Sequence, residues 1–292
     1  MASLKEIRNR LSSVKSTRQI TSAMKMVAAA RLRKAQDRIV KLRPYAGKLY
    51  EILKGVSLRM ETLEDENSYG RISDPEKVLI IVVTSNRGLC GAFNANVIRE
   101  AQRVAGEKYA EQKSNGNLWL FTIGRKGADY LGKRGFRIYE DHSNIFDDLT
   151  FENVSVISEK IMTGFLSGEF DRIEFVYNQF RNAATQDLTN ETFLPVEIGG
   201  VEDKEDAGDY IYEPSKEEII KELIPKALKV QFYKAILDSY VAEHGARMTA
   251  MHMATDNATQ FIRELTLEYN KARQASITNE ILEVVSGAEA LR

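Results

Sequence analysis

The stretch most suggestive of chemistry is TSNRGLCGAFN, residues 84–94. It follows a run of β-branched residues typical of a buried strand and precedes a helical pattern, and an α/β fold places phosphate-binding turns at such a junction. Its glycines, Gly88 and Gly91, fit neither the dinucleotide spacing GxGxxG nor the P-loop spacing GxxxxGK[ST]. We therefore interpret the stretch as a sharp structural turn rather than a nucleotide site.

A second glycine pair, Gly127 and Gly132, matches the P-loop spacing as far as Lys133. Arg134 then stands where the motif needs a hydroxyl group that binds magnesium. The segment also has a helical pattern, whereas a P-loop is a loop that follows a strand. We predict no nucleotide site here, and no cofactor elsewhere in the chain.

The three histidines are not arranged to bind a metal ion. His244 and His252 are eight residues apart on one predicted helix, which is too far for the common i, i+4 pair of ligands. His142 lies alone in a predicted loop. The sequence therefore predicts no metal site.

The remaining candidates are two carboxylates and one thiol. Asp147 and Asp148 are adjacent just before Leu149, which favours a loop or a helix cap over an acid/base pair. Cys90 is the single cysteine, so an intramolecular disulfide is excluded, and the pattern predicts a packing thiol. No catalytic constellation is complete, and we predict that the chain is not itself an enzyme.

A long helical pattern precedes this region, over residues 1–60. Apolar residues recur there at three- and four-residue steps, as in a coiled coil, at Leu4, Ile7, Leu11, Val14, Ala28, Leu32, Ala35, Ile39 and Leu42. Between residues 14 and 28 the heptad positions Arg18, Thr21 and Lys25 are polar. The apolar side shifts there to Ile20, Met24 and Val27, which predicts a change of neighbours.

The middle of the chain, residues 76–200, has an α/β pattern. Strands are predicted over 78–84, 118–124 and 172–180, and helices over 94–112, 125–134 and 152–166. Their alternation predicts a small, largely parallel, Rossmann-like domain. FLPVEI (193–198) is expected to add an edge strand, because Pro195 cannot donate to a ladder.

A second long helix is predicted within residues 212–292, from about residue 215 to 286, with Pro225 expected to kink it or restart it. It would be roughly 100 Å long and the first helix roughly 80 Å. If the two pair antiparallel as one discontinuous shaft, the last helix outruns the first by roughly 20 Å. That overhang is apolar, so it needs another molecule around it.

Charge is distributed unevenly along the chain. Residues 1–50 hold 13 Lys or Arg against Glu6 and Asp37, a local balance of +11, whereas residues 197–222 hold ten acidic residues against three Lys, a balance of −7. Such blocks are typical of solvated faces, and no nucleic-acid motif accompanies the basic one. No apolar run approaches the roughly 20 residues that span a bilayer, and no signal peptide is evident. We predict a soluble protein that meets a membrane only through partners.

Three segments carry a family resemblance. ITNEILEVVSGAEA (277–290) closely resembles the C-terminal signature of the gamma subunit of the F-type ATP synthase. IRNRLSSVKSTRQITSAMKMVAAARLRKAQ (7–36) and SNRGLCGAFN (85–94) resemble the same family, in the expected order over essentially the whole chain. In that family this subunit is the central shaft of a rotary motor. The resemblance implies that torque from the ion-driven membrane ring drives ATP synthesis on the beta subunits, and that ATP hydrolysis pumps ions in reverse.

The resemblance also implies partners and contact residues. The partners are three alpha and three beta subunits, the epsilon subunit and the membrane c-ring. The implied beta-subunit contacts are Arg273, Gln274, Thr278 and Glu280 above and Met24, Lys25 and Arg247 below. Ala288, Ala290 and Leu291 are expected to form a bearing in the head, and Tyr210 and Tyr212 the foot on the membrane ring. The implied location is the cytoplasmic face of the bacterial inner membrane, and a single cysteine implies no thiol gating of the chloroplast kind.

Two other functions stay open at this point. One is a small nucleotide-dependent enzyme whose long helices serve only for dimerisation. The other is a homodimeric coiled-coil scaffold. Ligand binding by the lone chain favours the first, and a stable dimer favours the second.

Overall fold

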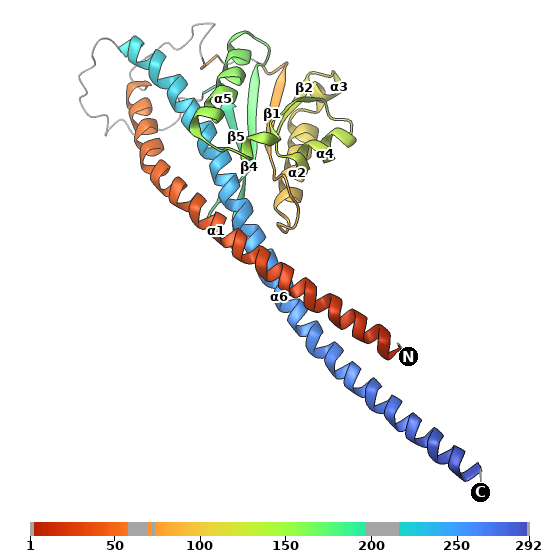
Figure 1. The fold of residues 1–292 in the computed structure, drawn as a ribbon. Coiled ribbons are helices and arrows are strands. Elements are labelled where there is room, and N and C mark those ends of the chain that lie inside the picture. The colour runs from red at the N-terminus through yellow and green to blue at the C-terminus, as the bar shows by residue number, and fades with distance from the viewer. Residues whose placement is uncertain (1–2, 58–68, 72–73, 197–215, 291–292) are drawn as a thin grey trace. The chain divides into compact units, whose positions relative to one another are not determined.

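The structure, a computed structural model, describes residues 3–57, 69–71, 74–196 and 216–290. The elements in chain order are α1 (Leu4–Ser57), β1 (Val78–Val83), α2 (Phe93–Arg103), the π-helix η1 (Val104–Lys108), α3 (Ala110–Ser114), β2 (Leu118–Ile123), α4 (Arg125–Lys133), β3 (Ile138–Asp141), the 3-10 helix η2 (Ser143–Phe146), α5 (Phe151–Leu166), β4 (Arg172–Phe180), β5 (Gln186–Leu194) and α6 (Lys216–Ala290). Figure 1 labels most of them along the chain. Two very long helices thus bracket a small α/β region, as the sequence predicts.

Two compact units share the chain. One combines Met1–Ala29 with Arg247–Arg292, and the other is Ala30–Ala246. Each long helix therefore contributes one part to each unit. The two units are described separately below.

The larger unit contains a five-stranded sheet with the order β3-β2-β1-β4-β5. β1 pairs in parallel with β2 and β4, β2 pairs in parallel with β3, and β4 pairs antiparallel with β5. The predicted, largely parallel sheet is confirmed, and so is the predicted edge strand. The bounds of that strand are wrong, however, because it covers Gln186–Leu194 and ends before Pro195.

Apolar side chains pack on both faces of this sheet. On one face Val78, Ile80 and Val82 of β1 form a buried cluster with α2 residues such as Val97. On the other face Phe175 of β4 and Phe193 of β5 meet Phe232 of α6 edge-to-face, with ring centroids 4.9 and 5.5 Å from Phe232. Figure 1 shows α5 and this part of α6 on one side of the sheet and α2 and α4 on the other. A sheet covered on both faces explains why its inner strands are continuously apolar.

Several predicted boundaries need correction. Residues 94–112 form not one helix but α2, η1 and α3 in succession. The short strand β3 was not predicted at all. α6 continues through Pro225 as one helix and does not restart there, and α1 likewise continues through Pro44, which is exposed.

Candidate functional site

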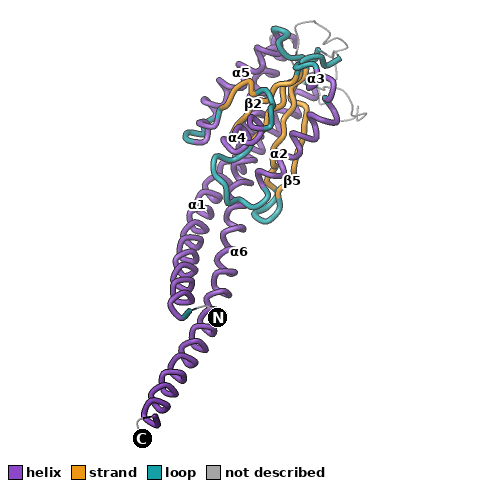
Figure 2. Tube along the Cα trace, turned by 90° about the vertical axis from the view of Figure 1, so that its right-hand side faces the viewer, coloured by secondary structure: helices purple, strands orange, loops and turns teal. Residues whose placement is uncertain are grey.

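The smaller unit is a pair of antiparallel helices built from the first part of α1 and the last part of α6. Its core consists of Ile7 and Ala28 from α1 and Met251, Ala258 and Leu265 from α6, all at most 8% exposed. Ile7 and Ala28 lie on the predicted apolar stripe of the first helix. Figure 2 shows the two helices running side by side.

Polar contacts between the two helices establish their direction. The Arg8 guanidinium donates to the Tyr269 hydroxyl over 3.2 Å and lies over its ring. Further along α1, the Thr255 hydroxyl donates to the Thr21 hydroxyl over 2.9 Å. Residue numbers rise along α1 as they fall along α6, so the pairing is antiparallel. The predicted antiparallel coiled coil is confirmed.

Near Thr21 the polar heptad positions keep α6 as their neighbour, and the predicted change of neighbours stays a prediction for the apolar residues that leave this side. The polar heptad positions stay on the α6 side, since Thr21 bonds Thr255 and the Lys25 ammonium lies 3.4 Å from His252 Nδ1. The apolar residues Ile20 and Val27 are instead 60% and 54% exposed. We call the contacts Thr21–Thr255 and Lys25–His252 the polar seam of the helix pair. It takes the place of apolar packing here, and the apolar side chains Ile20 and Val27 face away from α6.

The end of α6 carries an apolar surface that no described residue covers. The last buried side chain of the helix is Leu265, and every side chain from Ile277 to Glu289 is exposed. This exposed stretch is roughly 20 Å long. Its large apolar residues spread over roughly 160° of the circumference, wider than the stripe a surface helix needs, and they are Ile277, Ile281, Leu282, Val284 and Val285.

The predicted upper contact residues all lie on or next to this exposed stretch. Arg273, Gln274, Thr278 and Glu280 are exposed. Two hydrogen bonds here are local to the helix: the Thr278 hydroxyl donates to the Gln274 carbonyl over 2.9 Å, and the Ser276 hydroxyl donates to the Glu280 carboxylate over 3.4 Å. Their polar groups therefore face outward from a helix whose neighbouring side chains are apolar.

The remaining predicted residues are distributed as follows. Met24, Lys25 and Arg247 are half-buried, and Lys25 meets His252, whose ring also lies 3.4 Å from the Asp256 carboxylate. Ala288 is exposed and Ala290 is the last residue of α6. Tyr210, Tyr212 and Leu291 lie outside the described residues.

The Gly-rich loop after β1 forms a closed structural turn. Ser85 N–H donates to the Asn94 amide oxygen over 2.9 Å, and the Asn94 amide donates to the Ser85 hydroxyl over 2.8 Å. Cys90 and Phe93 pack against Ala242 of α6 in a buried cluster. Parallel sheets usually leave a ligand crevice at this edge, but here the loop and α6 fill it. This geometry agrees with the predicted structural turn.

The second glycine segment is likewise structural. Gly127 lies inside α4, and its N–H donates to the Thr84 hydroxyl over 2.8 Å. A Cβ on Gly124, whose φ is +114°, would lie 2.1 Å from the Thr84 carbonyl oxygen. Both glycines therefore allow the start of α4 to approach the end of β1 closely, and the P-loop spacing is fortuitous.

One buried charge cluster lies beneath η1. The π-helix brings Lys108 and Tyr109 onto the carboxylate of Glu174, which is 1% exposed and which Arg172 Nε also approaches at 3.3 Å. Burial, and then the bond to Glu174, raises the pKa of the Tyr109 hydroxyl. All three groups meet Glu174 Oε1, whereas Glu174 Oε2 is buried and has no hydrogen-bond partner among the described residues.

The described histidines and carboxylates take part in contacts with other side chains rather than in a metal site. His142 stacks on Phe121 and bonds Glu140 over 2.7 Å, and the Lys160 ammonium, followed by His142, holds the pKa of the Glu140 carboxyl below its usual range. Within the described ranges no group of three or more His, Cys, Asp or Glu could hold a metal ion. None of the described helices combines the length and hydropathy that a bilayer crossing requires.

Comparisons with known proteins cover the whole chain. A family model described as ATP synthase matches residues 3–291. The ATP synthase gamma chain of Flavobacterium johnsoniae is 57% identical over 291 residues, which are 100% of this chain and 99% of that one. The chain belongs to the ATP synthase gamma chain family. The resemblance inferred from three motifs is confirmed.

Other gamma chains of the family are similar over the same length. Those of Cytophaga hutchinsonii and Chlorobaculum tepidum are 50% and 46% identical and cover 100% of this chain. A chain in the Euglena gracilis mitochondrial ATP synthase structure with OSCP, F1 and c-ring has a TM-score of 0.69 at 23% identity, covering 99% of this chain and 94% of that one. One in the central stalk/c-ring structure from Tetrahymena thermophila has a TM-score of 0.58 at 23% identity, covering 80% and 99%. These structures share the fold.

Sequence reasoning missed part of this gamma chain's helix pair. The seam contacts Thr21–Thr255 and Lys25–His252 were not predicted, although the polar heptad positions were a signal for them. The sequence predicted an apolar overhang as a whole. It gave no separate role to Ile277, Val284 or Val285, which are exposed. Whether an apolar residue of α6 is exposed depends on whether α1 still runs beside it. The spacing of apolar residues within α6 alone does not give this information.

Proposed function

We propose that this chain is the central-stalk rotor subunit of an F-type ATP synthase. It transmits torque from the ion-driven membrane ring to a head of three alpha and three beta subunits, where ATP is synthesised. In reverse, ATP hydrolysis in the head turns the same shaft and pumps ions. The similarity to gamma chains over the full length of the chain carries this proposal.

The physical chemistry of α6 supports a housed shaft. Exposed apolar area costs roughly 25 cal/mol per Å², so a stretch with five large apolar side chains in water favours burial in a partner. A sleeve formed by other subunits would cover this stretch on all sides. The wide apolar arc suits a sleeve better than a single flat interface.

The predicted contact residues keep their roles within this proposal. Arg273, Gln274, Thr278 and Glu280 contact the beta subunits in the upper head, and Met24, Lys25 and Arg247 contact them lower down. Ala288, Ala290 and Leu291 form the bearing, since small apolar groups resist locking at one angle. Charged groups instead make contacts that differ between angular positions and so favour different states of the partner.

The other end of the subunit joins the membrane part of the complex. Tyr210 and Tyr212 contact the c-ring, and the α/β domain, taken as residues 76–200, joins the epsilon subunit. Residues 1–60 and 212–292 together form the shaft. The subunit is peripheral, on the cytoplasmic face of the bacterial plasma membrane, and carries no catalytic group.

Purification through a tag on this chain tests the proposal. We expect alpha and beta subunits to co-purify, each in threefold excess over the tagged chain, with ATPase activity in the complex. A tagged chain that ends after Ala275 serves as the comparison and should retain less of the head. A stable homodimer without alpha and beta, or stoichiometric nucleotide binding by the lone chain, would contradict the proposal and favour a scaffold or an enzyme.

A further inference from the structure

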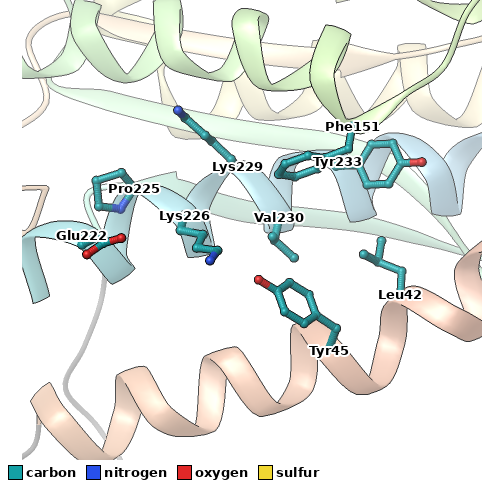
Figure 3. Close-up of a pocket in the computed structure, with 9 residues that line it drawn as sticks. All are labelled: Leu42, Tyr45, Phe151, Glu222, Pro225, Lys226, Lys229, Val230 and Tyr233. Atoms are coloured by element: carbon teal, nitrogen blue, oxygen red, sulfur yellow. The ribbon is translucent and has the colours of Figure 1, made fainter. Parts of the chain in front are cut away.

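A pocket of about 410 Å³ lies in the larger unit, between α1, the start of α5 and the first part of α6. Figure 3 shows Leu42 and Tyr45 of α1 on one side, Phe151 of α5 above, and Val230 and Tyr233 of α6 between them. Small-molecule sites in proteins are typically about 300–1,000 Å³ and mostly apolar. The pocket therefore has the size and character of a ligand site.

Aromatic rings dominate its walls. Phe151 and Tyr233 meet edge-to-face, with ring centroids 5.7 Å apart and an interplanar angle of 86°. Tyr45 lies across the pocket from them on α1 (Figure 3) and is 47% exposed. Rings held in this way favour a flat aromatic ligand, which gains from offset or edge-to-face contact, over a flexible alkyl chain.

The charges around the pocket favour one negative group on the ligand. Lys226 and Lys229 line it, against a single carboxylate, Glu222. Lys229 already pairs with Glu159 at 3.4 Å, outside the lining. Lys226 is exposed and forms no ion pair with any residue that the structure describes, and in Figure 3 its ammonium and the Tyr45 hydroxyl point toward one another. A carboxylate between these two groups would accept a hydrogen bond from each.

We propose that this pocket binds a small aromatic carboxylate, with the rings between Tyr45, Phe151 and Tyr233 and the carboxylate at Lys226 and the Tyr45 hydroxyl. The lining includes none of the residues named as contacts with the beta subunits, the bearing or the membrane ring. Because it takes walls from both α1 and α6, its ligand stabilises their packing. The inference does not depend on the proposed function.

Calorimetric titration of the purified full-length chain with 2-naphthoate tests the proposal. We expect one site per chain. Lys226→Gln should weaken binding about fivefold, as expected for an exposed charge pair. Tyr45→Ser, which removes a ring and a hydroxyl, should weaken it about tenfold. Both residues are exposed, so the fold should survive, and circular dichroism checks this. Lys133→Gln, an exposed lysine on α4 away from the pocket, is the matched control and should change nothing.

An uncharged analogue isolates the charge contact. 2-Naphthamide should bind the wild-type chain about fivefold more weakly than 2-naphthoate, and Lys226→Gln should not weaken the amide further. Equal binding of acid and amide would overturn the proposal. So would the absence of binding up to about 1 mM, or retention of full affinity in Tyr45→Ser. Loss of binding in Ile281→Asp alone would assign the ligand to the exposed end of α6 instead and would also overturn the proposal.

Discussion

α6 contains two stretches with similar apolar residues and opposite surroundings. In the first, Ile236, Leu237 and Val241 are at most 1% exposed, in the part of α6 whose Phe232 packs on the sheet. In the second, Ile281, Leu282 and Val284 are 57–72% exposed. One helix thus carries a stretch that is buried within its own domain and an end that no described residue covers. The difference teaches that the second stretch is built for a partner.

The largest expected effect concerns stability of the lone chain. Phe232→Ala removes a fully buried ring that meets Phe175 and Phe193, and should cost about 3–5 kcal/mol in the free energy of unfolding. Ile281→Ala should change it by less than about 0.5 kcal/mol, because that side chain is already in water. Urea denaturation followed by circular dichroism measures both. Equal costs would remove the contrast between the two stretches.

The contrast should reverse when assembly is measured. Ile281→Asp should leave the lone chain as stable as the wild type and should weaken association with alpha and beta by about 1.5–3 kcal/mol or more, the value of one buried isoleucine. The amounts of alpha and beta retained on the tagged chain report this loss. Asn279→Asp, on the same exposed stretch but outside the apolar arc, is the control. Undiminished assembly of Ile281→Asp argues against a housed end.

A smaller effect concerns the charge buried in the anchored stretch. Asp238 is fully buried, its Oδ1 bonds Arg43 at 3.3 Å, and its Oδ2 has no hydrogen-bond partner among the described residues. Burial raises the pKa of this carboxyl above that of an ordinary aspartate, and the Arg43 guanidinium opposes that shift. The folded state therefore binds the proton more tightly than the unfolded state does. The stability from this group is present below about pH 4 and is lost as pH rises through the folded pKa.

Asp238→Asn should therefore flatten the decline of stability above about pH 4. Arg43→Gln should extend the decline to higher pH, because it removes the charge that opposes the raised pKa. The urea midpoint, measured across this pH range, reports both slopes. Glu191 is a second carboxyl whose pKa is raised, first by burial and also by the nearby Asp238 charge, so Asp238→Asn lowers the pKa of Glu191 somewhat but leaves the effect of its burial. An unchanged slope in Asp238→Asn would mean that Asp238 does not titrate in this window.

The smallest effect belongs to the polar seam of the helix pair. Thr21→Val removes the bond to Thr255 and should cost about 0.5–1.5 kcal/mol locally. Thr17→Val is the matched control, because the Thr17 hydroxyl bonds only the Ser13 carbonyl of its own helix. Hydrogen exchange of the α6 amides near Thr255 measures the local change. Faster exchange in both variants alike would assign the effect to α1 itself rather than to the seam.

Sequence alone predicts the buried strands and the paired helices well, because their patterns reflect burial directly. VLIIVV of β1 is apolar at every position and lies buried on both faces. β3, with the sequence IYED, and the first part of β5, QDLTNET, have no such pattern. Backbone ladders to β2 and β4 hold them at the sheet edges, where side-chain burial is partial. Edge strands therefore escape a prediction based on apolar runs.

The candidate site could be predicted only in outline. The resemblance pointed to Arg273, Gln274 and Thr278, and their exposure on α6 fits that prediction without testing the contacts themselves. Leu265 and Leu282 of α6 are the same residue type on one helix, yet Leu265 is 7% and Leu282 57% exposed. The difference in exposure depends on where along α6 the first residues of α1 lie. It therefore depends on two segments that are distant in the sequence.

Thiol labelling of a single cysteine at position 281 tests the central claim most directly. In an Ile281→Cys, Cys90→Ala chain, the new thiol should react rapidly with a maleimide when the chain is alone, and about 100-fold more slowly in the assembled complex with alpha and beta. Val156→Cys, at a 69% exposed position on α5, controls for general loss of reactivity. If the thiol at 281 reacts equally fast in both states while the complex is intact, the end of α6 is not housed by the other subunits, and the rotor account is wrong.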